Sequence, residues 1–428
     1  MPRGASLRNQ ATLRKIQSSL VSVAGLGRRR DGVLFMRSTW KIALSLCAVM
    51  SLLLVPMAGV VSGASYPLPP SNAAIQDALE YLRGQQGADG SIGGFGDSAF
   101  ACIAIAAAGE DPNTWENGGP SLVEYLKDGP SDVSGEFNMG TFLARMVLAA
   151  VAAGESPSAF GSWSGSNAGV TITNGNYLAA LKSLHDGTQF LQDLMPDPDS
   201  AETLNDDFWA VRALIAAGES PYSSMVQSTV QHIINYQEAD GGWTWGTPSH
   251  TWYAPDSTDV DNTAAAIVAL CLGGHEGSAA VQDGLDFMRT YHDNSGGFVS
   301  IWSGVNVQTT AWAVDAIAAN GQDPGAGEWT PLASSPVDYL LSSQLADGSF
   351  GGMVRSTADT VLALVGAPRH ETSGPAPVTV GGEALRIDKA AVLALPLVAL
   401  CGLTVMVLVV FRSRFSRFVR TRYCSRTR

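Results

Sequence analysis

The chain has 428 residues, of which 46% are hydrophobic and 15% are charged, and its formal net charge is −13. The charge is unevenly distributed: residues 65–386 contain 9 of the 26 Lys and Arg but 37 of the 39 Asp and Glu, a net charge of −28. Such an acidic segment disfavours nucleic acid and anionic membrane surfaces as partners, so we expect no nucleic-acid function.

The N-terminal end has the features of a targeting segment. A basic cluster and Lys41 precede an apolar run at 42–61, which is followed by small residues at 62–65. This order predicts that residues 36–64 are a signal peptide, or a signal anchor if they are not cleaved. Because Met36 and the basic residues after it form an ordinary signal start, residues 1–35 are interpreted as a basic extension from a mispredicted start.

The C-terminal end predicts a membrane anchor. Residues 390–411 contain no charge, a length sufficient to span a bilayer, and the Arg-rich stretch 412–428 is typical of a cytoplasmic tail. We therefore predict a transmembrane helix over 389–411, with a buried core helix as the alternative. The Pro- and Gly-rich residues 367–388 predict a stalk. Together the two ends predict a single-pass cell-membrane protein whose residues 65–366 lie on the extracytoplasmic side.

Between these ends the sequence repeats. The same helix ending, with a glycine just past the last turn, recurs at Gly109, Gly154, Gly218 and Gly321. Each ending closes a helix that is apolar nearly all round. These inner helices are predicted at 96–108, 138–153, 205–217, 259–270, 306–319 and 354–366.

An amphipathic helix precedes each of these apolar helices. The amphipathic helices are predicted at 74–86, 121–128, 177–194, 228–237, 280–292 and 336–344. Six helices that are apolar on every side must be buried on every side, which six outer helices around a ring can achieve. The pattern therefore predicts an all-α domain over 65–366, an α6/α6 toroid of six helix pairs, with an open solenoid as the alternative.

A turn motif joins the two helices of a pair. It is Gln237-Glu-Ala-Asp-Gly-Gly-Trp243, it returns at 344–350 as Gln-Leu-Ala-Asp-Gly-Ser-Phe, and His replaces Gln in the copy at 292–298. A further copy begins at Gln86 and is read with an insertion that ends at Phe95. A Gln at the end of the outer helix can bond to the loop backbone, and glycine permits the tight turn.

Tandem Gln-x-x-x-Gly-x-Trp/Phe motifs resemble the repeat of the squalene-cyclase and protein-prenyltransferase superfamily, a terpenoid cyclase-like α/α toroid. The resemblance covers about residues 72–366. It implies the toroid fold but no single function, because that superfamily contains cyclases, prenyltransferase subunits, thioester domains and cobalamin carriers. The Cys-Gly-Glu-Gln sequence of the thioester domains is absent, and the extracellular cobalamin carriers match the predicted location.

One segment is similar to the proton-donor motif of the triterpene cyclases, Asp-x-Asp-Asp-Thr-Ala. Here it reads Asp259-Val-Asp261-Asn262-Thr-Ala, with Asn262 in place of the third acid. The resemblance implies that Asp261 is a general acid and Asp259 a supporting carboxylate, acting on an isoprenoid.

A capping role for the same acids is the simpler interpretation. Ser, Thr, Asp and Asn satisfy the free amides at a helix start. Each inner helix has such a residue near its expected start: Ser98, Thr141, Asp207, Thr263, Thr310 and Thr357. The sequence leaves open whether Asp259 and Asp261 are catalytic, only cap a helix, or contact a cation or ligand.

Aromatic side chains supply the candidate ligand contacts. Trp245, Trp252 and Tyr253 belong to one aromatic loop that precedes the acidic segment, where they could rim the mouth of the ring. Trp209, Trp302 and Trp312 are candidates for lining a pocket.

We predict no metal and no cofactor. Cys271 and His275 are four residues apart, but they stand at a helix end and lack the Asp-x-Cys of a zinc-binding prenyltransferase. The loop acids Asp89, Asp97, Asp240 and Asp347 are read as turn residues rather than calcium ligands. The function favoured by the sequence is binding of a small or apolar ligand or of a cell-surface partner, and the alternative is a triterpene-cyclase-like enzyme.

Overall fold

The computed structural model describes residues 66–131, 133, 138–254, 257–330 and 334–366. Regular structure in these residues is helical apart from two short hairpins, which confirms the all-α prediction for this region. The predicted signal segment, stalk, transmembrane helix 389–411 and basic tail lie outside the described residues. Within the described part of the chain, no helix is both long enough and apolar enough to cross a membrane.

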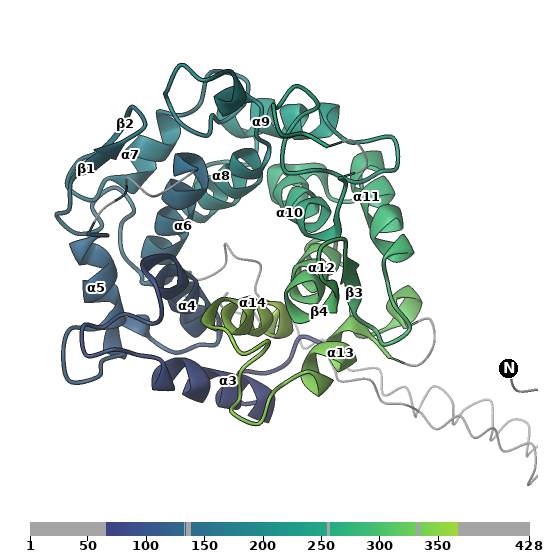
Figure 1. Cartoon of the computed structure of the whole chain (residues 1–428), viewed down its shortest axis with the longest axis horizontal. Helices are drawn as coiled ribbons and strands as arrows, with labels where there is room; N and C mark the ends of the chain where they lie inside the picture. The colour runs from purple at the N-terminus through teal and green to yellow at the C-terminus, as the bar shows by residue number, and fades with distance from the viewer. Residues whose placement is uncertain (1–65, 132, 134–137, 255–256, 331–333, 367–428) are drawn as a thin grey trace, which may run out of the picture. The chain divides into compact units, whose positions relative to one another are not determined.

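Six helices form an inner ring in which each packs against its two neighbours (Figure 1). The last of them, α14, packs against the first, α4, so the contacts close on themselves. The inner helices are α4 (Phe95–Ala107), α6 (Met139–Ala152), α8 (Asn205–Ala216), α10 (Val260–Leu270), α12 (Val307–Ala319) and α14 (Val354–Val365).

Six further helices surround this ring, each preceding its inner partner in the sequence (Figure 1). The outer helices are α3 (Ala73–Gly84), α5 (Leu122–Asp128), α7 (Tyr177–Lys182), α9 (Ser224–Asn235), α11 (Ala279–Thr290) and α13 (Pro336–Ser342). The six predicted helix pairs are therefore present in the described residues.

Short elements connect the helices. They are the 3₁₀ turns η1 (Pro112–Thr114), η2 (Pro198–Ala201) and η4 (Gly327–Trp329), and the π-helical turn η3 (Cys271–His275). The antiparallel hairpins, which were not predicted, are β1 (Gly165–Asn167) with β2 (Val170–Ile172), and β3 (Phe298–Ser300) with β4 (Gly304–Asn306). In β3–β4, Phe298 pairs with Asn306, so the hairpin leads directly into α12.

Burial follows the two sequence patterns. In α6 nearly every residue is buried, as expected for a helix with neighbours on all sides. In α11 only one face is buried, and its buried residues are Val281, Gly284, Leu285, Phe287 and Met288. A Cβ on Gly284 would lie 2.9 Å from the Trp243 ring and 3.1 Å from Ile267 of α10, so glycine lets α11 pack closely against the preceding helix pair.

Two copies of the turn motif fasten their pair to the next outer helix. Gln237 Nε2 donates to the carbonyls of Gly241 in its own loop (2.7 Å) and Ala280 in α11 (2.8 Å). Gln344 does the same for the last and first pairs, donating to Gly348 (2.9 Å) and to Ala74 in α3 (2.7 Å). Each of these two Gln side chains therefore bridges a carbonyl of its own loop and a carbonyl in the first turn of the next outer helix, and the Gln344 copy closes the ring.

The predicted helix over 177–194 is wrong in its second half. Helix α7 ends at Lys182, and the chain then turns through a copy of the motif in which His185 pairs with Phe190. This copy is one residue shorter than the others, so its spacing hides it. The insertion expected after Gln86 is also wrong, because Ile92 pairs with Gln86 and occupies the position of the aromatic residue.

Five of the six polar residues expected near the starts of the inner helices have another role, whereas Thr141 bonds locally to Asn138 at the start of α6. Side-chain caps come from Asn138, Asp259 and Asn306, whereas α4, α8 and α14 have no side-chain cap. The hydroxyls of Thr263, Thr310 and Thr357 lie one turn inside, where they accept from Trp243 N (3.0 Å), Phe298 N (2.9 Å) and Phe350 N (3.0 Å), respectively. Ser98 and Asp207 accept from Ile92 N (2.9 Å) and Phe190 N (2.7 Å). These residues hold the motif loop against the inner helix.

Candidate functional site

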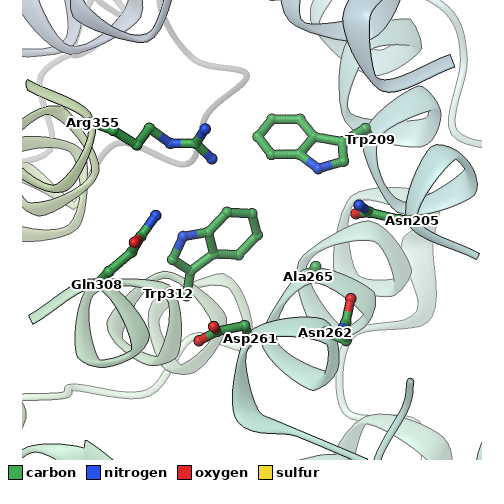
Figure 2. A pocket seen from close by; sticks show the side chains of 8 residues that line it. All are labelled: Asn205, Trp209, Asp261, Asn262, Ala265, Gln308, Trp312 and Arg355. Atoms are coloured by element: carbon green, nitrogen blue, oxygen red, sulfur yellow. The ribbon is translucent and has the colours of Figure 1, made fainter. Parts of the chain in front are cut away.

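A cavity of about 220 Å³ lies where the first turns of the inner helices converge. Figure 2 shows its wall, to which α8, α10, α12 and α14 contribute side chains. The lining residues are Asn205, Trp209, Asp261, Asn262, Ala265, Gln308, Trp312 and Arg355.

A smaller chamber of about 130 Å³ adjoins it and shares Asn205, Trp209 and Arg355 with the larger cavity. Phe100 from α4 and Thr141 and Arg145 from α6 complete its wall. The two chambers therefore draw on all six inner helices.

The lining residues form two tiers of equivalent positions. Counting back from the C-terminal glycine of each of the first five inner helices, with Gly274 in α10, the thirteenth and ninth preceding residues line a chamber in every case except Gly96. In α14, Thr357 matches Thr310 and sets the same register. The upper tier comprises Gly96, Thr141, Asn205, Asp261, Gln308 and Arg355, and the lower tier comprises Phe100, Arg145, Trp209, Ala265, Trp312 and Asp359. A spacing of four residues places both members of a helix on one face.

Three of the six lower-tier residues are aromatic, and their rings contact one another. The Trp209 and Trp312 rings meet edge to face with centroids 5.6 Å apart, and Phe100 meets Trp209 at 5.7 Å. The guanidinium group of the buried Arg212 lies 5.3 Å from the centroid of each indole and donates to the Ala265 carbonyl (3.2 Å). The cation stacks against both rings and so supports this wall of the cavity.

Asp261 is the acid of the upper tier. Its Oδ1 is buried and has no hydrogen-bond partner in the described residues. Burial raises the pKa of Asp261 to about 6; the Thr309 hydroxyl acts in the opposite direction, and the carboxylates of Asp259 and Asp359 raise the pKa further. Asp261 is therefore mainly a neutral acid below about pH 6 and mainly a carboxylate at neutral pH, where a small fraction still carries the proton.

Asp259 has a different position from Asp261. It is the N-cap of α10, where Oδ1 accepts from Asn262 N (2.8 Å) and Oδ2 accepts from Asn262 Nδ2 (2.6 Å). Burial raises the pKa of Asp259, and the hydrogen bonds from Asn262 oppose this. The structure thus separates the pair: Asp259 caps the helix, whereas Asp261 lines the cavity.

The aromatic candidates divide in the same way. Trp209 and Trp312 line the cavity. Trp302 lies on the β3–β4 hairpin with 79% of its surface exposed, and Trp252 is 66% exposed. Trp245 packs against His250, and the Tyr253 hydroxyl donates to Glu238 Oε1 (2.9 Å). None of the latter four lines either chamber.

Several lining residues were not predicted from the sequence. Asn205, Gln308 and Arg355 stand beside other polar residues in their helices, and Arg145 stands between apolar ones. Nothing in their local sequence distinguishes these four as lining residues. The distance of each from the glycine or threonine of its repeat would have identified them.

Among the described residues, no cluster of three or more His, Cys, Asp or Glu side chains is placed to hold a metal ion. Cys102 and Cys271 are free thiols, and burial raises the pKa of each to about 12. His275 lies 3.5 Å from Gln227 Oε1. The loop acids Asp89 and Asp347 accept from Ser91 and Ser349, as expected for turn residues.

No protein-family model and no curated protein matches this sequence. Similar solved structures include the type II terpene cyclase MstE from Scytonema, which is 15% identical with a TM-score of 0.46; the match covers 69% of this chain and 98% of that one. A variant of MstE in complex with its substrate geranylgeranyl dihydroxybenzoate is 14% identical with the same TM-score, over 69% and 96% of the two chains.

A protein from Actinoplanes is 15% identical with a TM-score of 0.42, over 68% of this chain and 98% of that one. At this level of similarity nothing follows about a shared substrate or reaction. Statements about function therefore depend on the cavity itself.

Proposed function

We propose that the central cavity binds a small molecule that has a flat apolar part and one or more hydrogen-bonding groups. The supporting observation is that Trp209 and Trp312 line one cavity together with the polar side chains of Asn205, Gln308 and Arg355. Indole faces favour flat apolar ligands, and the amide and guanidinium groups can fix their orientation. At about 220 Å³ the cavity is smaller than the roughly 300–1,000 Å³ typical of sites for drug-sized ligands, so a fused bicycle or a short isoprenoid suits it.

Binding of 2-naphthol to the full-length chain, measured by isothermal titration calorimetry, tests this proposal. Trp209→Leu and Trp312→Leu should each weaken binding at least tenfold, because each removes one of the cavity's indole walls. Trp252→Leu and Trp302→Leu are matched controls that should bind as the wild type does. An equal loss of affinity in the two cavity variants and the two control variants, or no binding by the wild type, would refute the cavity as the binding site.

For the architecture, we propose that the ring is an α6/α6 toroid of the squalene-cyclase and prenyltransferase type. We further propose that residues 36–64 and 389–411 direct the chain to the cell membrane and leave the ring outside. The apolar runs and the Arg-rich tail support this topology. Protease added to intact cells should release a fragment that contains the ring. If the ring is protected from protease until the cells are lysed, the proposed topology is wrong.

A second function, proton donation to an alkene, is favoured by Asp261. Its carboxyl group faces the cavity, has one buried oxygen without a hydrogen-bond partner in the described residues, and has a pKa of about 6. As a neutral acid it could give its proton to one carbon of the double bond. The O–H electrons would stay on the carboxylate, and the π electrons would form the new C–H bond. Loss of a proton from the resulting cation would return an isomerised or cyclised alkene.

Incorporation of deuterium tests this second function directly. The full-length chain is incubated in D2O with linear isoprenoid alcohols of increasing length, and the recovered alcohols are analysed by mass spectrometry. The wild type should introduce deuterium at carbon, whereas Asp261→Asn should not. Equal incorporation by both proteins, or none by the wild type, would refute the acid role while leaving ligand binding intact.

A further inference from the structure

Asp359 connects three side chains of the cavity wall. It is completely buried in α14, and its Oδ2 accepts from Gln308 Nε2 (3.3 Å), Trp312 Nε1 (3.3 Å) and Arg355 Nε (3.0 Å). The three donors come from two neighbouring helices, and all three line the larger chamber. One buried carboxylate oxygen is therefore shared by both helices at the site.

The position of Asp359 in the repeat makes this carboxylate unusual. The equivalent residues of the other inner helices are Phe100, Arg145, Trp209, Ala265 and Trp312, which all line a chamber directly. Asp359 is the only acid in the lower tier, and it lines neither chamber. Burying a carboxylate is costly unless an ion pair and hydrogen bonds compensate for it, and an apolar residue would pack the ring without that cost.

The three contacts restrict how the wall can move. Gln, Trp and Arg side chains each have several rotatable bonds, and holding them in one orientation before a ligand arrives reduces the entropy lost on binding. A shared acceptor couples the three orientations across α12 and α14, because moving one donor disturbs the oxygen on which the other two depend. Asp359 also raises the pKa of Asp261 through its charge, which connects it to the acid of the upper tier.

We propose that Asp359 is the positioning residue of the cavity and that it holds Trp312, Gln308 and Arg355 in the orientation that a ligand meets. The proposal rests on the proposed ligand-binding function. It assigns Asp359 no contact with the ligand, so its effect reaches the ligand only through the three side chains that it orients.

The test replaces Asp359 with asparagine in the full-length chain. Asp359→Asn keeps the shape but removes the charge that pairs with Arg355, and it should weaken 2-naphthol binding at least tenfold in protein that circular dichroism shows to be folded. Asp207→Asn is the matched control: Asp207 is equally buried, on α8, but bonds to a loop amide. This control should retain the wild-type affinity. An equal loss in both variants would mean that Asp359 is merely structural and would overturn the proposal.

A ligand-free measurement separates this inference from the proposed function. The indole N–H resonance of Trp312, assigned by its loss in Trp312→Phe, should shift in Asp359→Asn and remain in place in Asp207→Asn. An unshifted resonance overturns the positioning role even if 2-naphthol binds. A shifted resonance with no binding by the wild type refutes the proposed function but retains the positioning of Trp312.

If Asp359→Asn fails to fold, Trp312→Phe provides the test. This variant keeps an aromatic ring and removes the donor to Asp359, so it should weaken binding several-fold while leaving the ring of helices folded. Wild-type affinity in Trp312→Phe would overturn the proposal.

Discussion

Replacing Asp261 with asparagine distinguishes a cavity acid from a helix cap by the sign of the stability change. The pKa of Asp261 is about 6 in the folded protein, against 3.8 for the free side chain. Because the folded value is the higher, the folded state binds the proton more tightly. The stability that this group contributes is therefore present at low pH and is lost as the pH rises from about 4 through 6. A pKa difference of one corresponds to about 1.4 kcal/mol, so ionised Asp261 should lower the free energy of unfolding by about 3 kcal/mol at neutral pH.

Asp261→Asn should consequently be the more stable protein above about pH 7, by about 2–3 kcal/mol, because asparagine is never ionised. The advantage should shrink steadily towards pH 4, where wild-type Asp261 is largely protonated in the folded state. Urea denaturation followed by circular dichroism, extrapolated to water at each pH, measures both quantities.

A neutral cap provides the control. Asn306 is the N-cap of α12 and accepts from Thr309 N (2.9 Å), so Asn306→Ala should cost about 1 kcal/mol at every pH. Because asparagine caps a helix about as well as aspartate, a capping Asp261 predicts little change in Asp261→Asn. If Asp261→Asn is no more stable than the wild type above pH 7, the ionised carboxylate is not destabilised by the cavity and the cavity reasoning fails.

Three further substitutions test how the ring is held together. Gly109→Ala should lower the free energy of unfolding by about 1–2 kcal/mol, from its positive φ alone. Gly348→Ala should lower it clearly more, because the added Cβ would also lie 2.2 Å from a carbonyl oxygen of α3. Equal melting temperatures for the two variants would contradict this. Gln344→Ala should lower the free energy of unfolding, measured by urea denaturation, by about 2–3 kcal/mol, because two carbonyls lose their donor where the ring closes. A change below about 0.5 kcal/mol would refute the role of Gln344 in closing the ring. Thr263→Val should accelerate hydrogen exchange at the Trp243 amide, which loses its acceptor, and unchanged exchange would restore the capping interpretation of Thr263.

The helix pairs could be predicted because two periodicities and a stop signal agree. Apolar runs, amphipathic runs and a glycine after each inner helix mark the same boundaries, and Gly109, Gly154, Gly218 and Gly321 all adopt positive φ as expected. The prediction failed at 177–194, because the apolar residues continue at helical spacing beyond Lys182. Only the Asp-Gly turn at 186–187 interrupts them, and a single glycine does not exclude a helix.

The helix starts were harder to place because the same residue types serve two purposes. Ser, Thr and Asp cap helices, but they also accept hydrogen bonds from distant backbone amides. Thr263, Thr310 and Thr357 do the latter, and three inner helices begin without any side-chain cap. Local sequence contains no information about which amide a hydroxyl meets across a folded loop, so this distinction required the structure.

The site could be predicted only in part, because aromatic residues do not reveal which way they face. Trp302 and Trp312 are ten residues apart and were equal candidates, yet one is exposed on a hairpin and the other lines the cavity. The repeat register separates them: Trp312 is nine residues before Gly321, as Trp209 is before Gly218. Lumen-facing residues of such repeats are therefore better sought by their distance from the helix-ending glycine than by residue type.

The same register identifies a third set of equivalent positions below the cavity. Seven residues after the upper tier, the inner helices carry Ile103, Leu148, Arg212, Val268, Asp315 and Leu362, all buried. These side chains lie one turn beneath the lower tier, on the side away from the upper tier. Asp261 belongs to the upper tier, in the first turn of α10, and lines the same cavity as Trp209 and Trp312. One ligand in this cavity can therefore meet the acid and both indoles, as the proposed proton donation requires.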